Sequence, residues 1–109
     1  MESMARVFHA MGEPMRLRLL NALSAGDRSV NELVAATGTG QPNVSKHLSV
    51  LINAGMLRRR KEGVKVCYSL AGEMPLQLVS LMEAADSRIA KHRDNLTIRS
   101  APRSPRKDL

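Results

Sequence analysis

The segment from Thr37 to Gly55, TGTGQPNVSKHLSVLINAG, begins with hydrogen-bonding side chains and ends with apolar ones at helical spacing. Its polar positions are Gln41, Asn43, Ser45, Lys46 and His47. Gln and Asn can form paired hydrogen bonds with adenine, and Lys can donate to guanine, so such side chains can read the edges of DNA bases. The apolar stripe that would hold the helix on a core consists of Val44, Leu48, Leu51 and Ile52. The segment predicts a recognition helix, with an ordinary helical hairpin bearing a polar surface as the alternative.

A basic cluster follows this helix directly and consists of Arg58, Arg59, Arg60, Lys61 and Lys65. Glu62-Gly63 separates two runs of β type, which predicts a hairpin with its turn there. In the second run, the residues expected to pack on the core are Val64, Val66, Tyr68 and Leu70, and Lys65, Cys67 and Ser69 alternate with them. A basic hairpin at this place is suited to gripping phosphates or the minor groove as a wing. The alternative is a solvated strand edge whose charges prevent aggregation.

Helices must position both features, and the sequence marks where they begin and end. The apolar stripe of a first helix consists of Met4, Val7, Phe8 and Met11. Pro14 begins a second helix, which ends at Gly26. SVNE, from Ser29 to Glu32, is a capping box that starts a third helix, and the turn TGTG joins this helix to the recognition helix. A last helix is predicted from about Met74 into the early nineties.

Two stretches of the chain resemble the ArsR/SmtB family of bacterial winged-helix repressors. They are FHAMGEPMRLRLLNAL, at the family's opening, and VNELVAATGTGQPNVSKHLSVLINAGMLRRRKEGVKVCYSL, over its helix-turn-helix and wing. The resemblance implies a mainly α fold with a small β-hairpin, in which four helices, two strands and a last helix follow one another. It also implies a repressor that binds an operator near its own promoter and is released by an inducing signal. The family's base-reading positions fall on Gln41, Ser45 and Lys46, with Asn43 and His47 beside them.

The predicted organisation is a winged helix-turn-helix domain over residues 1–94, which binds DNA and dimerises, and a disordered basic tail over residues 95–109. The resemblance implies a homodimer joined through the first and last helices. The expected interface residues are Met4, Phe8, Met11, Leu78, Leu81, Met82, Ala85 and Ile89. The last helix is apolar over so much of its girth that it should pack on more than its own core. Two recognition helices would then reach major grooves about 34 Å apart, so the operator is expected to be an imperfect palindrome.

The metal sites familiar in this family are not matched by the residues here. The family's Cys-x-Cys position falls on Ser29 and Asn31, which supply no thiolate. The positions of its second site fall on about Gly72, Met74, Ala85 and Arg88. We therefore predict no metal and no other cofactor, and the inducing signal stays open. The single cysteine, Cys67, is a redox candidate because its basic neighbours favour the thiolate; the alternative is a small strand residue without chemistry.

The formal net charge of +7 favours a polyanionic partner, most simply double-stranded DNA. The sequence shows no secretory signal and no apolar run of transmembrane length, so we expect a cytoplasmic protein without a membrane partner. Paired carboxylates, a Ser/His/Asp set and a phosphate loop are all missing, which argues against an enzyme. The rival function is a winged-helix module that binds another protein through its last helix and has no operator of its own.

Overall fold

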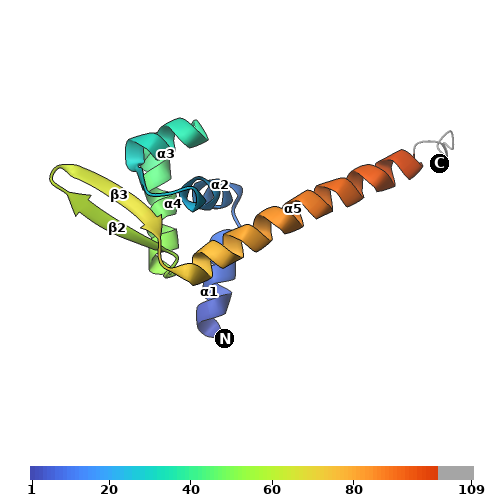
Figure 1. The fold of residues 1–109 in the computed structure, drawn as a ribbon, viewed down its shortest axis with the longest axis horizontal. Coiled ribbons are helices and arrows are strands. Elements are labelled where there is room, and N and C mark those ends of the chain that lie inside the picture. The colour runs from blue at the N-terminus through green and yellow to red at the C-terminus, as the bar shows by residue number, and fades with distance from the viewer. Residues whose placement is uncertain (101–109) are drawn as a thin grey trace. The chain divides into compact units, whose positions relative to one another are not determined.

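The computed structural model describes the backbone of residues 1–100 and the side chains of residues 1–96, so residues 101–109 of the predicted tail lie outside the described part. The chain divides into two compact units, residues 1–79 and residues 80–109. The first unit contains α1 (Glu2–Met11), α2 (Pro14–Ser24), β1 (Arg28–Ser29), α3 (Val30–Thr37), α4 (Gln41–Asn53), β2 (Leu57–Glu62) and β3 (Lys65–Leu70), as Figure 1 shows. The last helix, α5 (Glu73–Ser100), begins in the first unit and continues in the second. This order confirms the predicted winged helix-turn-helix fold.

The helices begin and end at signals that the sequence carries. Pro14 occupies the first turn of α2, where its missing N–H costs nothing, and the Glu13 side chain caps this helix by accepting from a backbone N–H at 3.5 Å. Arg16 Nε donates to the carbonyl oxygen of Ala10 at 2.7 Å, which ties the end of α1 to the start of α2. Gly38 closes α3 with φ 71°, a left-handed conformation that glycine adopts without a steric penalty.

The three strands form one antiparallel sheet in the order β1-β3-β2. Pairing of β2 with β3 extends from Leu57 opposite Leu70 to Glu62 opposite Lys65. The turn therefore consists of residues 63 and 64, and Gly63 has φ 63°, as the first position of a type II′ turn requires. The predicted turn at residues 62 and 63 is displaced by one residue, because Glu62 still pairs within the ladder.

The core of the first unit is almost entirely aliphatic. Its most deeply buried side chains include Leu19, Leu20, Leu33, Val44, Leu48, Leu51, Met56 and Val79. These residues come from α2, α3, α4 and the start of α5, and from the link between α4 and β2. Tyr68 of β3 adds the one buried aromatic ring among the described residues, while Phe8 is exposed. The packing holds the helix-turn-helix and the sheet in one body.

Three features differ from the expectations drawn from the sequence. Val64, expected in the core, is fully exposed, because it lies in the turn, where the alternation of a strand does not apply. The strand β1 was not expected, since two residues carry no detectable periodicity. α5 continues to Ser100, so residues 95–100 are helical where a disordered tail was predicted. The helix can continue this far because the sequence has no proline or glycine between Pro75 and Pro102 that would interrupt it.

Candidate nucleic-acid interface

The helix-turn-helix consists of α3, residues 38–40 and α4. Gly40 is the N-cap of α4 in an extended conformation, with φ −70° and ψ 159°, so the chain enters this helix sharply from the turn. Val44, Leu48 and Leu51 are each at most 1% exposed and fix one side of α4 on the core. Anchoring through these three residues leaves the opposite side of the helix facing outward. The arrangement confirms three of the four residues of the predicted buried stripe, while the fourth, Ile52, is half-buried.

The five predicted base-reading residues differ in how free their side chains are. Gln41, Asn43 and Lys46 are exposed, while Ser45 and His47 are half-buried. Asn43 Nδ2 donates to Thr39 Oγ1 at 3.2 Å, so this side chain also braces the turn. His47 Nδ1 is buried without a hydrogen-bond partner among the described residues. Gln41 and Lys46 are therefore the members best placed to contact another molecule.

The exposed surface of α4 is longer than the five predicted residues. Successive residues of an α-helix are rotated by about 100°, so Ser49 and Asn53 follow Lys46 along the same side. Both of these side chains are exposed. Neither residue is among the five predicted ones, although the spacing from Lys46 is the signal that places both on this side. The polar surface of α4 thus extends over the whole helix.

The basic cluster of the wing divides between the two faces of the hairpin. Residues directly opposite each other in an antiparallel pair project to the same face. One face carries Arg59 and Lys61, and the other carries Arg58, Arg60 and Lys65. Tyr68 and Val66 share the face of the first pair. All five cations are exposed, so the wing presents positive charge in two directions.

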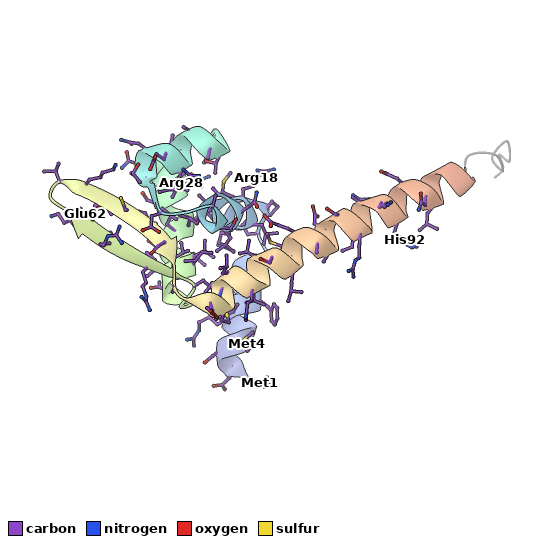
Figure 2. The ribbon with its side chains drawn as sticks, viewed as in Figure 1. Met1, Met4, Arg18, Arg28, Glu62 and His92 are labelled. Carbon is purple, nitrogen blue, oxygen red and sulfur yellow. The ribbon has the colours of Figure 1, made fainter. Side chains whose placement is uncertain are left out.

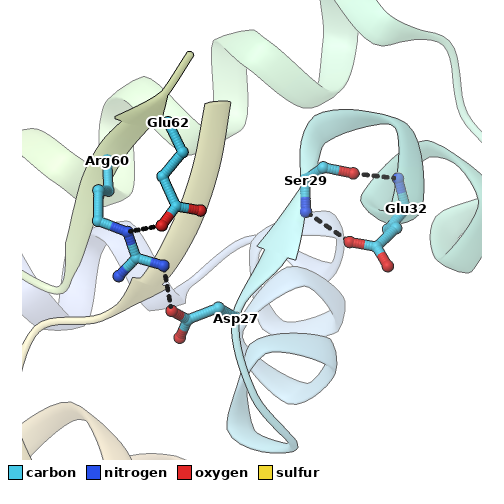
Figure 3. Close-up of polar contacts among 5 residues, drawn as sticks. All are labelled: Asp27, Ser29, Glu32, Arg60 and Glu62. Atoms are coloured by element: carbon cyan, nitrogen blue, oxygen red, sulfur yellow. Dashed lines mark hydrogen bonds and ion pairs between the residues drawn. The ribbon is translucent and has the colours of Figure 1, made fainter. Parts of the chain in front are cut away.

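Arg60 differs from the other cations of the wing because it is ion-paired. One terminal nitrogen lies 3.2 Å from Asp27 Oδ2, and its Nε lies 3.5 Å from Glu62 Oε2, as Figure 3 shows. Figure 2 places Glu62 near the end of the hairpin. Arg58 and Arg59 form no ion pair with a described residue. The charge of Arg60 is thus offset by two carboxylates of the protein, while Arg58 and Arg59 have no such partner among the described residues.

The first helix of the helix-turn-helix is fixed by the predicted capping box. Ser29 Oγ accepts from the backbone N–H of Glu32 at 3.2 Å, and Glu32 Oε1 accepts from the backbone N–H of Ser29 at 2.8 Å. The backbone hydrogen bond from Ser29, followed by the contact with its side chain, lowers the pKa of Glu32 below its ordinary value. Glu32 therefore stays ionised beside the N-terminus of α3, where a negative charge is favourable.

Comparisons with known proteins decide which family this architecture represents. The sequence model of the family described as "Bacterial regulatory protein, arsR family" matches residues 13–59. A "Probable mercury resistance operon repressor" from Streptomyces lividans is 38% identical over 91 residues, which cover 82% of this chain and 73% of the relative. This protein belongs to the arsR family. It is accordingly a transcriptional regulator with a DNA-binding winged helix-turn-helix.

Solved structures of transcriptional regulators share the fold. A homodimeric winged helix-turn-helix DNA-binding domain from Mycobacterium bovis has a TM-score of 0.77 at 31% identity, with 84% of each chain covered. The transcriptional repressor BigR from Xylella fastidiosa has a TM-score of 0.71 at 31% identity, with 77% of this chain and 86% of BigR covered. Both likenesses cover more than three quarters of this arsR-family chain.

The apolar residues predicted to join two copies of this arsR-family chain are described in each unit separately. In the first unit, Met4, Met11 and Leu78 are half-buried and Phe8 is 58% exposed. In the second unit, Met82 is half-buried, Ala85 is exposed, and Leu81 and Ile89 are 67% and 60% exposed. Such large exposed apolar side chains at helical spacing are typical of a surface that another molecule covers.

The described part of this arsR-family protein contains no group of three or more His, Cys, Asp or Glu side chains that could hold a metal ion. Cys67 is half-buried in the middle strand of the sheet, opposite Arg60 on one side and Ser29 on the other. Within the described residues, no helix has the length and apolar character needed to cross a membrane.

Proposed function

We propose that this arsR-family protein is a repressor that binds a two-fold symmetric operator as a homodimer. In this proposal the N-terminal half of α4 enters the major groove, and the wing contacts the flanking backbone. The observation that carries it is the division of α4 into a buried stripe and an exposed polar side. Gln41 and Lys46 lie on the exposed part, and their chemistry suits adenine and guanine edges.

The wing supplies the contacts that carry no sequence information. Arg58, Arg59, Lys61 and Lys65 are exposed cations close in sequence to α4, and phosphate neutralisation by such residues dominates affinity for DNA. Val64 is fully exposed at the turn between them. An apolar residue at the end of a basic hairpin is suited to contact with the sugars of the minor groove. The proposed interface therefore combines base contacts from α4 with backbone contacts from β2 and β3.

Dimerisation is proposed from the exposed apolar residues and from the relatives. The M. bovis domain is described as homodimeric, and the S. lividans and X. fastidiosa relatives are named repressors. A single copy of α4 reads only a few base pairs, so a second copy doubles the contacts and selects an inverted repeat. Leu81 and Ile89 on α5 and Phe8 on α1 are the large exposed apolar side chains among the expected interface residues.

The test measures sequence discrimination by residues of α4. Wild-type protein first enriches duplexes from a randomised library, and fluorescence anisotropy then compares the enriched duplex with a scrambled one. The Gln41→Ala variant should lose discrimination by about 5- to 150-fold for each base contact removed, the range of a good bidentate contact. Asn53→Ala is the matched control, because Asn53 is the last residue of α4, outside the N-terminal half that is proposed to enter the major groove, and this variant should keep the wild-type discrimination.

Two outcomes would contradict the proposal. Failure of the wild-type protein to prefer any duplex would leave no operator to bind, and the winged-helix interaction module would then be the better account. Equal losses of affinity by Gln41→Ala on the enriched and the scrambled duplex would remove α4 from base recognition.

A further inference from the structure

Arg60 sits at the centre of an ion-pair triad on one face of the sheet. Its guanidinium lies 3.2 Å from Asp27 Oδ2 and 3.5 Å from Glu62 Oε2. The three side chains are 54%, 44% and 60% exposed, so none is free of competition from water. Figure 3 shows Arg60 reaching from the wing towards the segment that precedes α3. From this geometry we propose that Arg60 is a positioning residue of the wing and not a DNA ligand, with Asp27 as its partner.

The contact between Arg60 and Asp27 joins the outer strand β2 to the residue that directly precedes the other outer strand, β1. The strand order is β1-β3-β2, so β3 lies between the strand of Arg60 and the strand that Asp27 precedes. Cys67 of β3 is opposite Arg60 on one side and opposite Ser29 on the other. Because Arg28 is opposite Tyr68, the ion pair runs diagonally across the middle strand, from Arg60 at the level of Cys67 to Asp27 beyond the level of Tyr68. Strand β1 is only two residues long, so this ion pair is a further contact beside the two residue pairs that join β1 to β3.

The same tie connects the wing to the helix-turn-helix. Asp27 is two residues from Ser29, which is both the end of β1 and the N-cap of α3. The Ser29 capping box then fixes the first turn of α3 through hydrogen bonds of 2.8 and 3.2 Å. Through this series of contacts, the direction of β2 is linked to the start of the helix that leads into the turn and α4. Holding the wing and α4 in one arrangement reduces the ordering cost of binding both to one DNA site.

This inference rests on the proposed DNA binding. The Asp27→Asn substitution tests it, because electrostatic attraction and wing positioning predict opposite changes in the affinity for DNA. Asp27→Asn removes a negative charge beside the wing, so electrostatic attraction alone predicts tighter binding to DNA. The positioning role predicts weaker binding, because the partner of Arg60 is lost. The two ideas thus move the dissociation constant in opposite directions.

The experiment titrates full-length protein by anisotropy against the duplex enriched by the wild type and against a scrambled duplex, at several salt concentrations. Asp27→Asn and Arg60→Gln should each weaken binding to the enriched duplex by about two- to five-fold, the range of exposed ion pairs. The double variant should be no weaker than either single variant, because both remove the same contact. Arg60→Lys, which keeps a cation opposite Asp27, should recover part of the loss.

The salt dependence separates positioning from phosphate contact. Arg58→Gln is the matched control, since Arg58 lies two residues away on the same strand face and has no ion pair with a described residue. Its loss should lower the slope of log K against log salt by about 0.9 for each phosphate contact removed. Arg60→Gln should leave that slope unchanged. Thermal unfolding followed by circular dichroism verifies that all variants fold.

Tighter binding by Asp27→Asn, or a slope for Arg60→Gln that falls like that of Arg58→Gln, would overturn the inference and make Arg60 a phosphate ligand. In either of these two outcomes, the wild-type protein still prefers the enriched duplex. Absence of that preference in the wild type is a different outcome, which overturns the proposed function itself.

Discussion

Replacing Ser29 by alanine is expected to lower the free energy of unfolding by about 1–2 kcal/mol. Ser29 is the N-cap of α3 and is 8% exposed, and its Oγ accepts the backbone N–H of Glu32 at 3.2 Å. An N-cap of this kind contributes about 0.5–2 kcal/mol, and burial favours the upper half of that range because water replaces the lost acceptor poorly. For a domain of this size, each kcal/mol lowers the melting temperature by about 4–8 °C.

Thermal unfolding followed by far-ultraviolet circular dichroism measures this loss. Ser24→Ala is the matched control, because Ser24 is the half-buried last residue of α2 and its Oγ donates to the Asn21 carbonyl oxygen in an exposed hydrogen bond of 2.6 Å. The control should change the free energy of unfolding by less than about 0.5 kcal/mol, as exposed substitutions usually do. If Ser29→Ala melts no lower than Ser24→Ala, the capping box does not hold α3 as described.

The capping box also predicts a dependence of stability on pH. The backbone hydrogen bond from Ser29, then its side chain, holds the pKa of Glu32 below its ordinary value. A carboxyl with a lowered folded-state pKa stabilises the fold above its unfolded pKa and loses that contribution as the pH falls through the folded value. The stability advantage of wild type over Glu32→Gln should therefore be largest near neutral pH and shrink in acid. Urea unfolding across this range measures it, and a gap that does not change with pH would contradict the assignment.

Two further predictions concern the dimer and the thiol. Leu81→Arg places a charge on an exposed apolar position of α5 and should give a monomer by analytical ultracentrifugation, with affinity for a two-half-site duplex reduced by about 100-fold or more. Ser87→Arg is on another side of the same helix and should stay dimeric; equal behaviour of the two variants would remove Leu81 from the interface. We also propose that oxidation of Cys67 weakens operator binding, because added bulk would disturb the sheet between Arg60 and Ser29. Mild oxidation should lower the affinity of wild type but not of Cys67→Ser, and the same loss in both would exclude the thiol.

Much of the fold could be predicted because its boundaries are local. The capping box at Ser29 and Pro14 in the first turn of α2 are each defined by a few adjacent residues. The buried stripe of α4 follows from helical periodicity. The position of the hairpin turn depends on the exact pairing of β2 with β3, and it was predicted less accurately. The turn lies one residue later than predicted, so it includes Val64. As a turn residue, Val64 is exposed to solvent and does not pack in the core.

The candidate site was predictable in composition but not in its internal contacts. The sequence identifies Arg60 only as one of five cations, because its partner Asp27 is 33 residues away and has no pattern linking the two. The hydrogen bond from Asn43 to Thr39 is shorter in range, yet the sequence alone does not separate a side chain that braces a turn from one that faces DNA. The length of α5 depends on how far a weakly patterned sequence remains helical before Pro102, which periodicity alone does not decide.

The most direct test of the account is a dimethyl sulfate footprint on the duplex enriched by the wild-type protein. This reagent methylates guanine N7 in the major groove, where the N-terminal half of α4 is proposed to bind. The account predicts two protected blocks, related by two-fold symmetry and centred about 10 base pairs apart. It also predicts that Gln41→Ala weakens both blocks equally. Unprotected major-groove guanines in a duplex that is demonstrably bound, or a single block without a symmetric partner, would contradict a dimer that reads DNA through α4.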